Sequence, residues 1–276
     1  MRFLVVCSKV FLGVSLTALL LACANTTRSG AVGVNRSQFL AVSASEVDRL
    51  SAISYNDQNQ KAKEKNILIT SGPAYDRLKR ISARLIAQTG VFRDDTQQWN
   101  WQLVIINAPI LNATCAPGGK ITFYTGLIDQ LNLTDDEIAA IMGHEIAHAL
   151  REHGRERLSQ AMAQSAVANI AMAVAGPYGS AVSAANQAAQ YVLVLPNSRQ
   201  NESEADAIGL ELAARAGYNP RAAISVWQKM NKATEGKGTF EFLSTHPSGD
   251  TRIEQLTELM PAVEPLYQAS NKPRMK

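Results

Sequence analysis

The stretch that decides the fold is Gly143-His144-Glu145-Ile146-Ala147-His148. On a helix, residues four apart lie on the same face one turn apart, so both imidazoles can bind one ion. Glu145 lies about 100° round the helix from His144, and therefore beside that ion. From there its carboxylate can take a proton from an attacking water and later give it to a leaving amine.

Zinc suits this arrangement of side chains. Imidazole and carboxylate ligands are typical of zinc, and an open fourth position lowers the pKa of a bound water toward neutrality. The helix is otherwise mostly apolar, carrying Ile138, Ile141, Met142, Ile146, Ala149 and Leu150. The sequence therefore predicts a core helix whose two histidines bind one zinc ion per chain. The alternative is a chance pattern on a helix with structural histidines.

A third protein ligand has to come from elsewhere in the chain. His153 lies about 140° off the ligand face if the helix continues, which favours a supporting or surface position. The metzincin pattern requires Gly at position 151 and His at position 154. The chain has Arg151 and Gly154 there, so that class is excluded.

The acidic run from Glu202 to Asp206 supplies carboxylates. Glu202 and Asp206 share a helical face, whereas Glu204 lies about 200° from Glu202. We predict that Glu202 is the third ligand and that Asp206 accepts the free N–H of a ligating histidine, which would fix its tautomer. The alternatives are Glu204 as the ligand, and a solvated acidic helix start that the helix dipole favours.

In these motifs the chain resembles the zinc metalloendopeptidase family of the CAAX prenyl protease and HtpX type. The Leu20–Cys23 sequence, which resembles a lipobox, favours the periplasmic lipoprotein branch of that family. The resemblance covers roughly residues 70 to 260. The matching residues are Gly143 with His144–His148, Ser198-Arg199 with Glu202–Asp206, Asn112-Ala113 before Pro117-Gly118-Gly119, and Thr245-His246-Pro247 followed by Arg252.

The resemblance implies a gluzincin-like zinc peptidase domain of the α+β class, mostly α, with a small β-sheet whose edge strand lines the active-site cleft. It implies that His144, His148 and Glu202 bind zinc and that Glu145 is the general base and acid. An extended substrate would pair with the edge strand backbone to backbone. That strand would consist of Asn112, Ala113, Thr114, Cys115 and Ala116. Members often carry an aromatic residue at the position of Thr114, which leaves the local substrate preference open.

The roles of His246 and Arg252 also stay open. By the resemblance, His246 either approaches the metal as an inhibitory fourth ligand or stabilises the oxyanion, so we count it among the catalytic candidates. A surface histidine before a proline is the alternative. Arg252 would steady the His246 loop or a substrate carbonyl, or lie exposed on its helix.

The N-terminus is typical of a secretory signal. An apolar run over residues 11–22 is too short to span a bilayer comfortably, and it closes on Leu20-Leu21-Ala22-Cys23. This resembles a bacterial lipobox, in which the thiol of Cys23 accepts a diacylglycerol. Ala24 favours the outer membrane, so we expect a lipid anchor at its periplasmic face. An ordinary signal peptide or an uncleaved anchor is the alternative.

The domain prediction follows from these signals. Residues 1–22 are a lipoprotein signal peptide, 23–40 the lipidated Cys23 with a flexible tether, 41–262 the zinc metallopeptidase domain, and 263–276 a loose C-terminal tail. Cys7 would leave with the signal and Cys23 would carry lipid. Cys115 would then be alone, as a buried small side chain that forms no intramolecular disulfide.

Local patterns predict the order of the elements. Helices are expected at about 45–66, 73–90, 134–152, 198–215, 220–232 and 248–260, and extended segments at 99–106 and 112–124. The Ala-rich segment 161–195 carries several polar residues. It therefore favours two packed or site-covering helices over a membrane span.

Composition limits the functions to consider. With 27 Lys and Arg against 24 Asp and Glu, the chain carries no strong charge, and it lacks the basic stripe of nucleic-acid binders. The expected function is a zinc endopeptidase in protein quality control that cleaves unfolded or misassembled envelope proteins. One alternative is a latent or chaperone-like zinc lipoprotein that acts with a partner in outer-membrane protein assembly. A structural lipoprotein with a metal-stabilised core is a third reading.

Overall fold

The computed structural model describes residues 23–167, 187–188, 190–234, 241–246 and 251–270. The predicted signal peptide and residues 168–186 of the Ala-rich segment lie outside this part of the chain. Among the described helices, none combines the length and the apolar character needed to cross a membrane.

A four-stranded sheet forms one layer of the fold. Its order is β3 (Leu68–Ile69), β4 (Gln102–Ile106), β6 (Lys120–Tyr124) and β5 (Ala113–Ala116). β4 and β6 are parallel, and the other neighbours are antiparallel. Gly118 and Gly119 close the β5–β6 hairpin with φ angles of 72° and 81°, a backbone region that favours glycine. The hairpin leaves β5 at the edge of the sheet.

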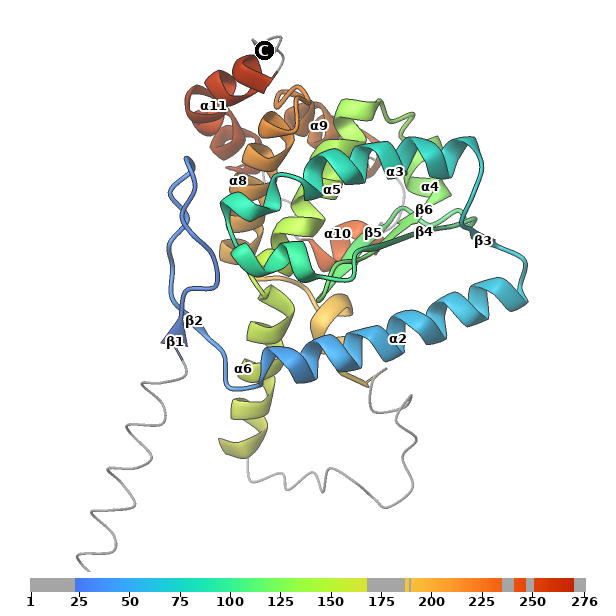
Figure 1. Ribbon diagram of the computed structural model, residues 1–276, viewed down its shortest axis with the longest axis vertical. Coiled ribbons are helices and arrows are strands. Elements are labelled where there is room, and N and C mark those ends of the chain that lie inside the picture. Colours follow the sequence, from blue (N-terminus) through green and yellow to red (C-terminus); the bar gives the residue numbers. More distant parts are fainter. Residues whose placement is uncertain (1–22, 168–186, 189, 235–240, 247–250, 271–276) are drawn as a thin grey trace, which may run out of the picture.

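Helices cover both faces of this sheet (Figure 1). α2 (Ala44–Glu64) runs along one face, while α3 (Pro73–Ile86) and α5 (Asp135–Leu150) lie on the other. α5 begins with the predicted capping box, in which Thr134 and Glu137 bond each other's backbone N–H. From Glu137 to Leu150, every residue of α5 except Ala140 is buried. The predicted core helix is thus confirmed, and so is the mostly helical α+β class.

The other described elements are η1 (Thr89–Val91), η2 (Asp94–Gln98), α4 (Thr125–Gln130), α6 (His153–Val167), the π-helix η3 (Gln190–Val194), α8 (Arg199–Arg215), α9 (Ala222–Thr234), α10 (Glu241–Thr245) and α11 (Thr251–Ser270). Of these, α6, α8 and α9 pack against α5. α8 packs most extensively against α5, and α11 lies against α8. The core of the molecule is therefore the α5–α8 pair, enclosed by the sheet on one side and α11 on the other.

The segment after Cys23 differs from the expected flexible tether. β1 (Cys23–Ala24) pairs with β2 (Gln38–Phe39), and Arg36 forms ion pairs with Glu156 and Glu204. The polar composition of residues 23–40 was the reason for expecting a tether. The partners of Arg36 lie 120 and 168 residues further along the chain, so no local pattern could reveal them.

The C-terminal stretch also differs from the expected loose tail. α11 continues to Ser270 through Pro261 and Pro265, although a proline inside a helix costs about 3 kcal/mol. Val263 is fully buried, and the Ser270 hydroxyl donates to the carbonyl of Ala214 on α8. This packing outweighs the local cost that the two prolines indicate.

Candidate metal centre

Two glycines allow α5 and α8 to touch backbone to backbone. A Cβ on Gly143 would lie 2.8 Å from the Gly209 oxygen, and a Cβ on Gly209 would lie 2.6 Å from the His144 nitrogen. Any larger side chain would push the helices apart. The close approach places Glu202 and Asp206 of α8 beside His144 of α5.

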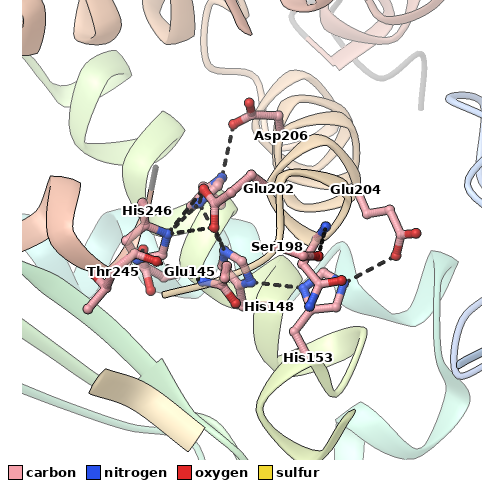
Figure 2. A network of polar contacts seen from close by, with 12 residues as sticks. Glu145, His148, His153, Ser198, Glu202, Glu204, Asp206, Thr245 and His246 are labelled. Carbon is pink, nitrogen blue, oxygen red and sulfur yellow. Dashed lines mark hydrogen bonds and ion pairs between the residues drawn. The ribbon is translucent and has the colours of Figure 1, made fainter. Parts of the chain in front are cut away.

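The three predicted ligands meet at this contact. His144 Nε2 lies 3.0 Å from His148 Nε2, and Figure 2 shows His148 beside Glu202 and His246. The two carboxylate oxygens of Glu202 lie 3.4 Å from His144 Nε2 and 3.3 Å from His148 Nε2. All three side chains are buried. The structure therefore brings together donor atoms from two helices at positions where they can share one ion.

His246 joins the same group. Its Nδ1 lies 3.1 Å from a Glu202 oxygen and 3.2 Å from His144 Nε2, and Phe242 of α10 stacks on its ring at 4.4 Å. One atom each of His144, His148, Glu202 and His246 lies within 4.8 Å of all the others. The surface position considered for His246 is wrong, because the residue is buried in the ligand cluster.

The protonation states of the cluster fit a bound cation. Burial lowers the pKa of His148 well below its usual value, so this ring is neutral and can offer a lone pair. Burial alone would raise the pKa of Glu202, but His246 and the other histidines hold it well below its usual range. For His144, bonds to Asp206 and Glu202 overcome burial and raise the pKa to about 9. The residues thus favour a positive charge at their centre, which a zinc ion would supply in place of a proton.

Glu145 lies next to the cluster and outside its shortest contacts. Its Oε1 is 3.4 Å from His246 Nε2, and burial raises the pKa of its carboxyl group. A carboxyl group whose pKa rises toward the working pH can both accept and return a proton. The geometry therefore allows the acid–base role expected for Glu145.

Asp206 and Arg252 contact two of the predicted ligands, His144 and Glu202. Asp206 Oδ1 lies 3.0 Å from His144 Nδ1. Arg252 donates to both oxygens of Asp206 and to Glu202 Oε2, each over 2.7 Å, and its guanidinium lies 3.7 Å from the centroid of the Trp227 ring. Arg252 is buried, so the exposed position considered for it is wrong. Its contacts orient the Glu202 and Asp206 carboxylates.

His153 has the supporting position that was one of its two predicted places, and the surface position is wrong because the residue is fully buried. Its Nδ1 lies 2.8 Å from His148 Nδ1, and its Nε2 lies 3.2 Å from Glu204 Oε2. The estimate of 140° assumed one continuous helix. The chain instead leaves α5 after Leu150, adopts a φ of 51° at Glu152 and begins α6 at His153.

The Glu204 carboxylate binds Arg151, Arg36 and His153. Through His153, Glu204 is linked to His148, and it lies outside the group of four side chains that could hold an ion. The alternative of Glu204 as the third ligand is not supported by this arrangement.

The expected edge strand lies beside the cluster. Asn112 accepts a bond from Tyr124 on β6, so by alternation Ala113 and Cys115 direct their backbone groups away from β6. The Ala113 N–H donates to the Asn112 side chain, and the Cys115 N–H interacts with the Glu145 carboxylate. The outer edge of β5 therefore faces Glu145.

A small cavity lies along this edge. Its lining combines β5 with residues of the cluster, of α6 and of η3, including Thr114, Cys115, Glu145, His148, Arg157, Val192 and His246. Its volume of about 20 Å³ holds roughly one water molecule. A peptide can enter only if some of these lining residues move.

Comparison with known proteins identifies a family. The sequence model of peptidase family M48 matches residues 74–260, which is more than half of the chain. The chain is 37% identical over 159 residues to mitochondrial metalloendopeptidase OMA1 of Arabidopsis thaliana, covering 58% of this chain and 31% of that protein.

Two Escherichia coli proteins are also similar. Metalloprotease LoiP is 26% identical over 257 residues, covering 92% of this chain and 96% of LoiP. The beta-barrel assembly-enhancing protease is 27% identical over 157 residues, covering 54% of this chain and 32% of that protein. The chain spans only 31% to 66% of the length of the OMA1 relatives that it matches. The match of the family model over residues 74–260 nevertheless shows that this chain belongs to peptidase family M48.

Proposed function

We propose that this protein is a zinc-dependent endopeptidase. The proposal is carried by one observation, the convergence of His144, His148 and Glu202 next to Glu145 at the edge of a β-strand. Two imidazoles and one carboxylate are a usual donor set for catalytic zinc. When bound, zinc would polarise the scissile carbonyl and lower the pKa of a water.

The chain's own residues would perform the other parts of the reaction. Glu145 takes a proton from the attacking water and passes it to the leaving amine. Asp206 and Arg252 hold His144 and Glu202 in place, so that the ligands need no reorganisation during turnover. The edge of β5 binds the substrate main chain in an extended form. We propose the segment Asn112–Ala116 for this role.

The same binding mode suggests the substrate class. Pairing with β5 uses backbone groups and reads little side-chain chemistry, which suits unfolded or misassembled proteins with accessible main chain. We propose such proteins of the cell envelope as substrates. The name of the similar beta-barrel assembly-enhancing protease supports a partner in outer-membrane protein assembly.

We further propose that the protein is a lipoprotein whose diacylglycerol is attached to Cys23, with residues 1–22 removed. Cys23 is exposed at the start of β1, so its thiol is accessible for such a modification. The lipid would hold the peptidase domain, residues 41–262 with the α11 extension, at the periplasmic face of the outer membrane.

A second candidate is a latched or chaperone-like form of the same protein. His246 lies among the ligand atoms, and the cavity has room for roughly one water. Both features favour a closed state in which His246 occupies the position that a substrate carbonyl needs. This form would bind zinc and proteins without cleaving them until a partner moves the His246 segment.

Cleavage of casein by the zinc-loaded full chain in detergent tests the proposal, with Glu145→Gln as the matched variant. We expect the native chain to cleave casein, and the variant to bind one zinc ion per chain and cleave none. Equal cleavage by both would refute the role of Glu145. Zinc binding without cleavage by either chain would favour the latched form.

A further inference from the structure

Three buried polar atoms in the cleft have no hydrogen-bond partner among the described residues. One is Oε1 of Glu145, which already has the acid–base role proposed above, and the other two are Nη1 of Arg157 and Oδ1 of Asn197. Both residues line the cavity that Glu145, His148 and His246 share with β5. A buried donor or acceptor without a partner costs about 1–3 kcal/mol. Such groups are rare, and each calls for an explanation such as a ligand that satisfies it.

Arg157 is held in place by the rest of its guanidinium group. Its Nε donates to the Tyr191 carbonyl over 3.0 Å, and its Nη2 donates to the Val192 carbonyl. Both carbonyls belong to η3. Because the guanidinium is planar, these two bonds also fix the direction of Nη1. A donor is therefore oriented in advance with no acceptor in the described chain.

Asn197 is fixed in a similar way. Its Nδ2 donates to the Thr245 carbonyl over 3.3 Å, and its backbone N–H donates to the same oxygen over 2.9 Å. These bonds leave Oδ1 as an acceptor with no donor in the described chain. Asn197 directly precedes Ser198, the N-cap of α8, which anchors it to the core.

We propose that Arg157 and Asn197 bind the main chain of the substrate, Arg157 through Nη1 to a carbonyl and Asn197 through Oδ1 to an N–H. This inference rests on the proposed function. A free donor and a free acceptor are the complement of the groups that every peptide unit carries. β5 borders the cavity through Thr114 and Cys115, and Arg157 and Asn197 line the same cavity. Main-chain groups of an extended substrate that do not pair with β5 would then bond to these two side chains.

The charge of Arg157 suits a donor to a substrate carbonyl. Burial lowers the pKa of Arg157 to about 10, while the charges of Glu202 and Glu145 oppose that shift. The guanidinium therefore stays charged at neutral pH, and a charged donor forms a stronger hydrogen bond than a neutral one.

The test is a coupling experiment on the zinc-loaded Glu145→Gln chain, which binds peptides without cleaving them. Fluorescence anisotropy gives the Kd of a short unstructured peptide and of its ester variants, in which one amide at a time is replaced. An ester lacks the N–H and has a weaker carbonyl acceptor. Combined with Arg157→Met or Asn197→Leu, the series forms a double-mutant cycle for each peptide bond.

We expect Arg157→Met to raise the Kd of the all-amide peptide about tenfold or more. In the parent chain, an ester at one particular bond should raise the Kd of the peptide. In Arg157→Met, the same ester should cause no such rise in Kd. In Asn197→Leu, the rise in Kd caused by an ester should disappear at a different bond. Asn197→Asp keeps the acceptor but cannot donate to Thr245, and in this variant the ester at that bond should still raise the Kd.

Two controls separate direct contact from support of the cleft. Arg155→Met removes an arginine on the same helix that bonds Val42 and Glu152 instead, and it should leave the Kd unchanged. The ester scan on the parent chain needs no cleft mutation, so it remains informative if a variant misfolds. An equal rise in Kd for every peptide, or no rise, would overturn the proposal.

The coupling result and the cleavage result are independent. Casein cleavage without coupling would refute the roles of Arg157 and Asn197 and leave the proposed peptidase standing. Coupling without cleavage by the native chain would keep both residues as peptide ligands and refute the proposed activity.

Discussion

Replacing Gly209 by alanine tests whether the α5–α8 contact positions the metal ligands. The added Cβ would lie 2.6 Å from the His144 nitrogen and 2.8 Å from both the Gly143 carbonyl carbon and the His144 Cα. All three are backbone atoms, so no side-chain rotation relieves the clash. Opening the shortest contact to 3.4 Å, where ordinary contacts begin, requires the helices to separate by about 0.8 Å.

That separation acts on the ligands because they lie on the two helices. His144 and His148 stay with α5, while Glu202 moves with α8. Metal–ligand distances tolerate only about 0.2 Å of deviation, so a shift of this size would weaken the Glu202 bond. We expect zinc affinity to fall by about tenfold to a hundredfold. Stability should fall by about 1–3 kcal/mol from overpacking.

Competition with a chelator of known affinity measures the first effect, and thermal unfolding measures the second. Gly90→Ala is the matched control, because a Cβ there would meet only Gln97 Nε2 at 3.6 Å. A folded Gly209→Ala chain with unchanged zinc affinity would refute the reasoning. It would mean that the helices can separate without disturbing the site.

Three further predictions follow from single contacts. His246→Ala should leave casein cleavage unchanged or raise it if His246 is a latch, and a complete loss would instead assign it to catalysis. His153→Phe keeps the ring but removes the bond to His148, so a chelator titration should show about tenfold to a hundredfold weaker zinc binding. Burial raises the pKa of Glu137, but Lys229 and the capping bonds lower it below its usual value. The stability it contributes near neutral pH is therefore lost as the pH falls below about 4. Glu137→Gln should cost about 1 kcal/mol at neutral pH and nothing in acid, as thermal unfolding at both pH values would show.

Local sequence patterns were sufficient for most of the elements. The Thr134–Glu137 capping box and the Ser198 cap mark helix starts that the structure has at the next residue. Such signals are reliable because the atoms that satisfy them lie three residues apart. α11 is the exception, since its prolines favour an earlier end and its burial against α8 depends on distant residues.

The site was predictable to the extent that it follows helical geometry. The spacing of His144 and His148, and of Glu202 and Asp206, requires only the angle between residues on one helix. The supporting position of His153 was among the predictions, but its direct contact with His148 required knowing that the helix breaks at Glu152. No sequence pattern predicts that atoms of Arg157 and Asn197 lack partners, because this depends on which residues enclose the cleft.

The network behind His148 shows why the N-terminal segment belongs to the site. His148 contacts His153, His153 contacts Glu204, and Glu204 pairs with Arg36. A buried polar network is stable only when each member has its partners, so the position of Arg36 contributes to the orientation of His148, a proposed zinc ligand. Arg36 follows β1, which begins at Cys23. If Cys23 carries the lipid as proposed, the membrane anchor is attached to the same folded segment that contains Arg36. The distance between membrane and cleft would then be set by folded structure instead of by a tether.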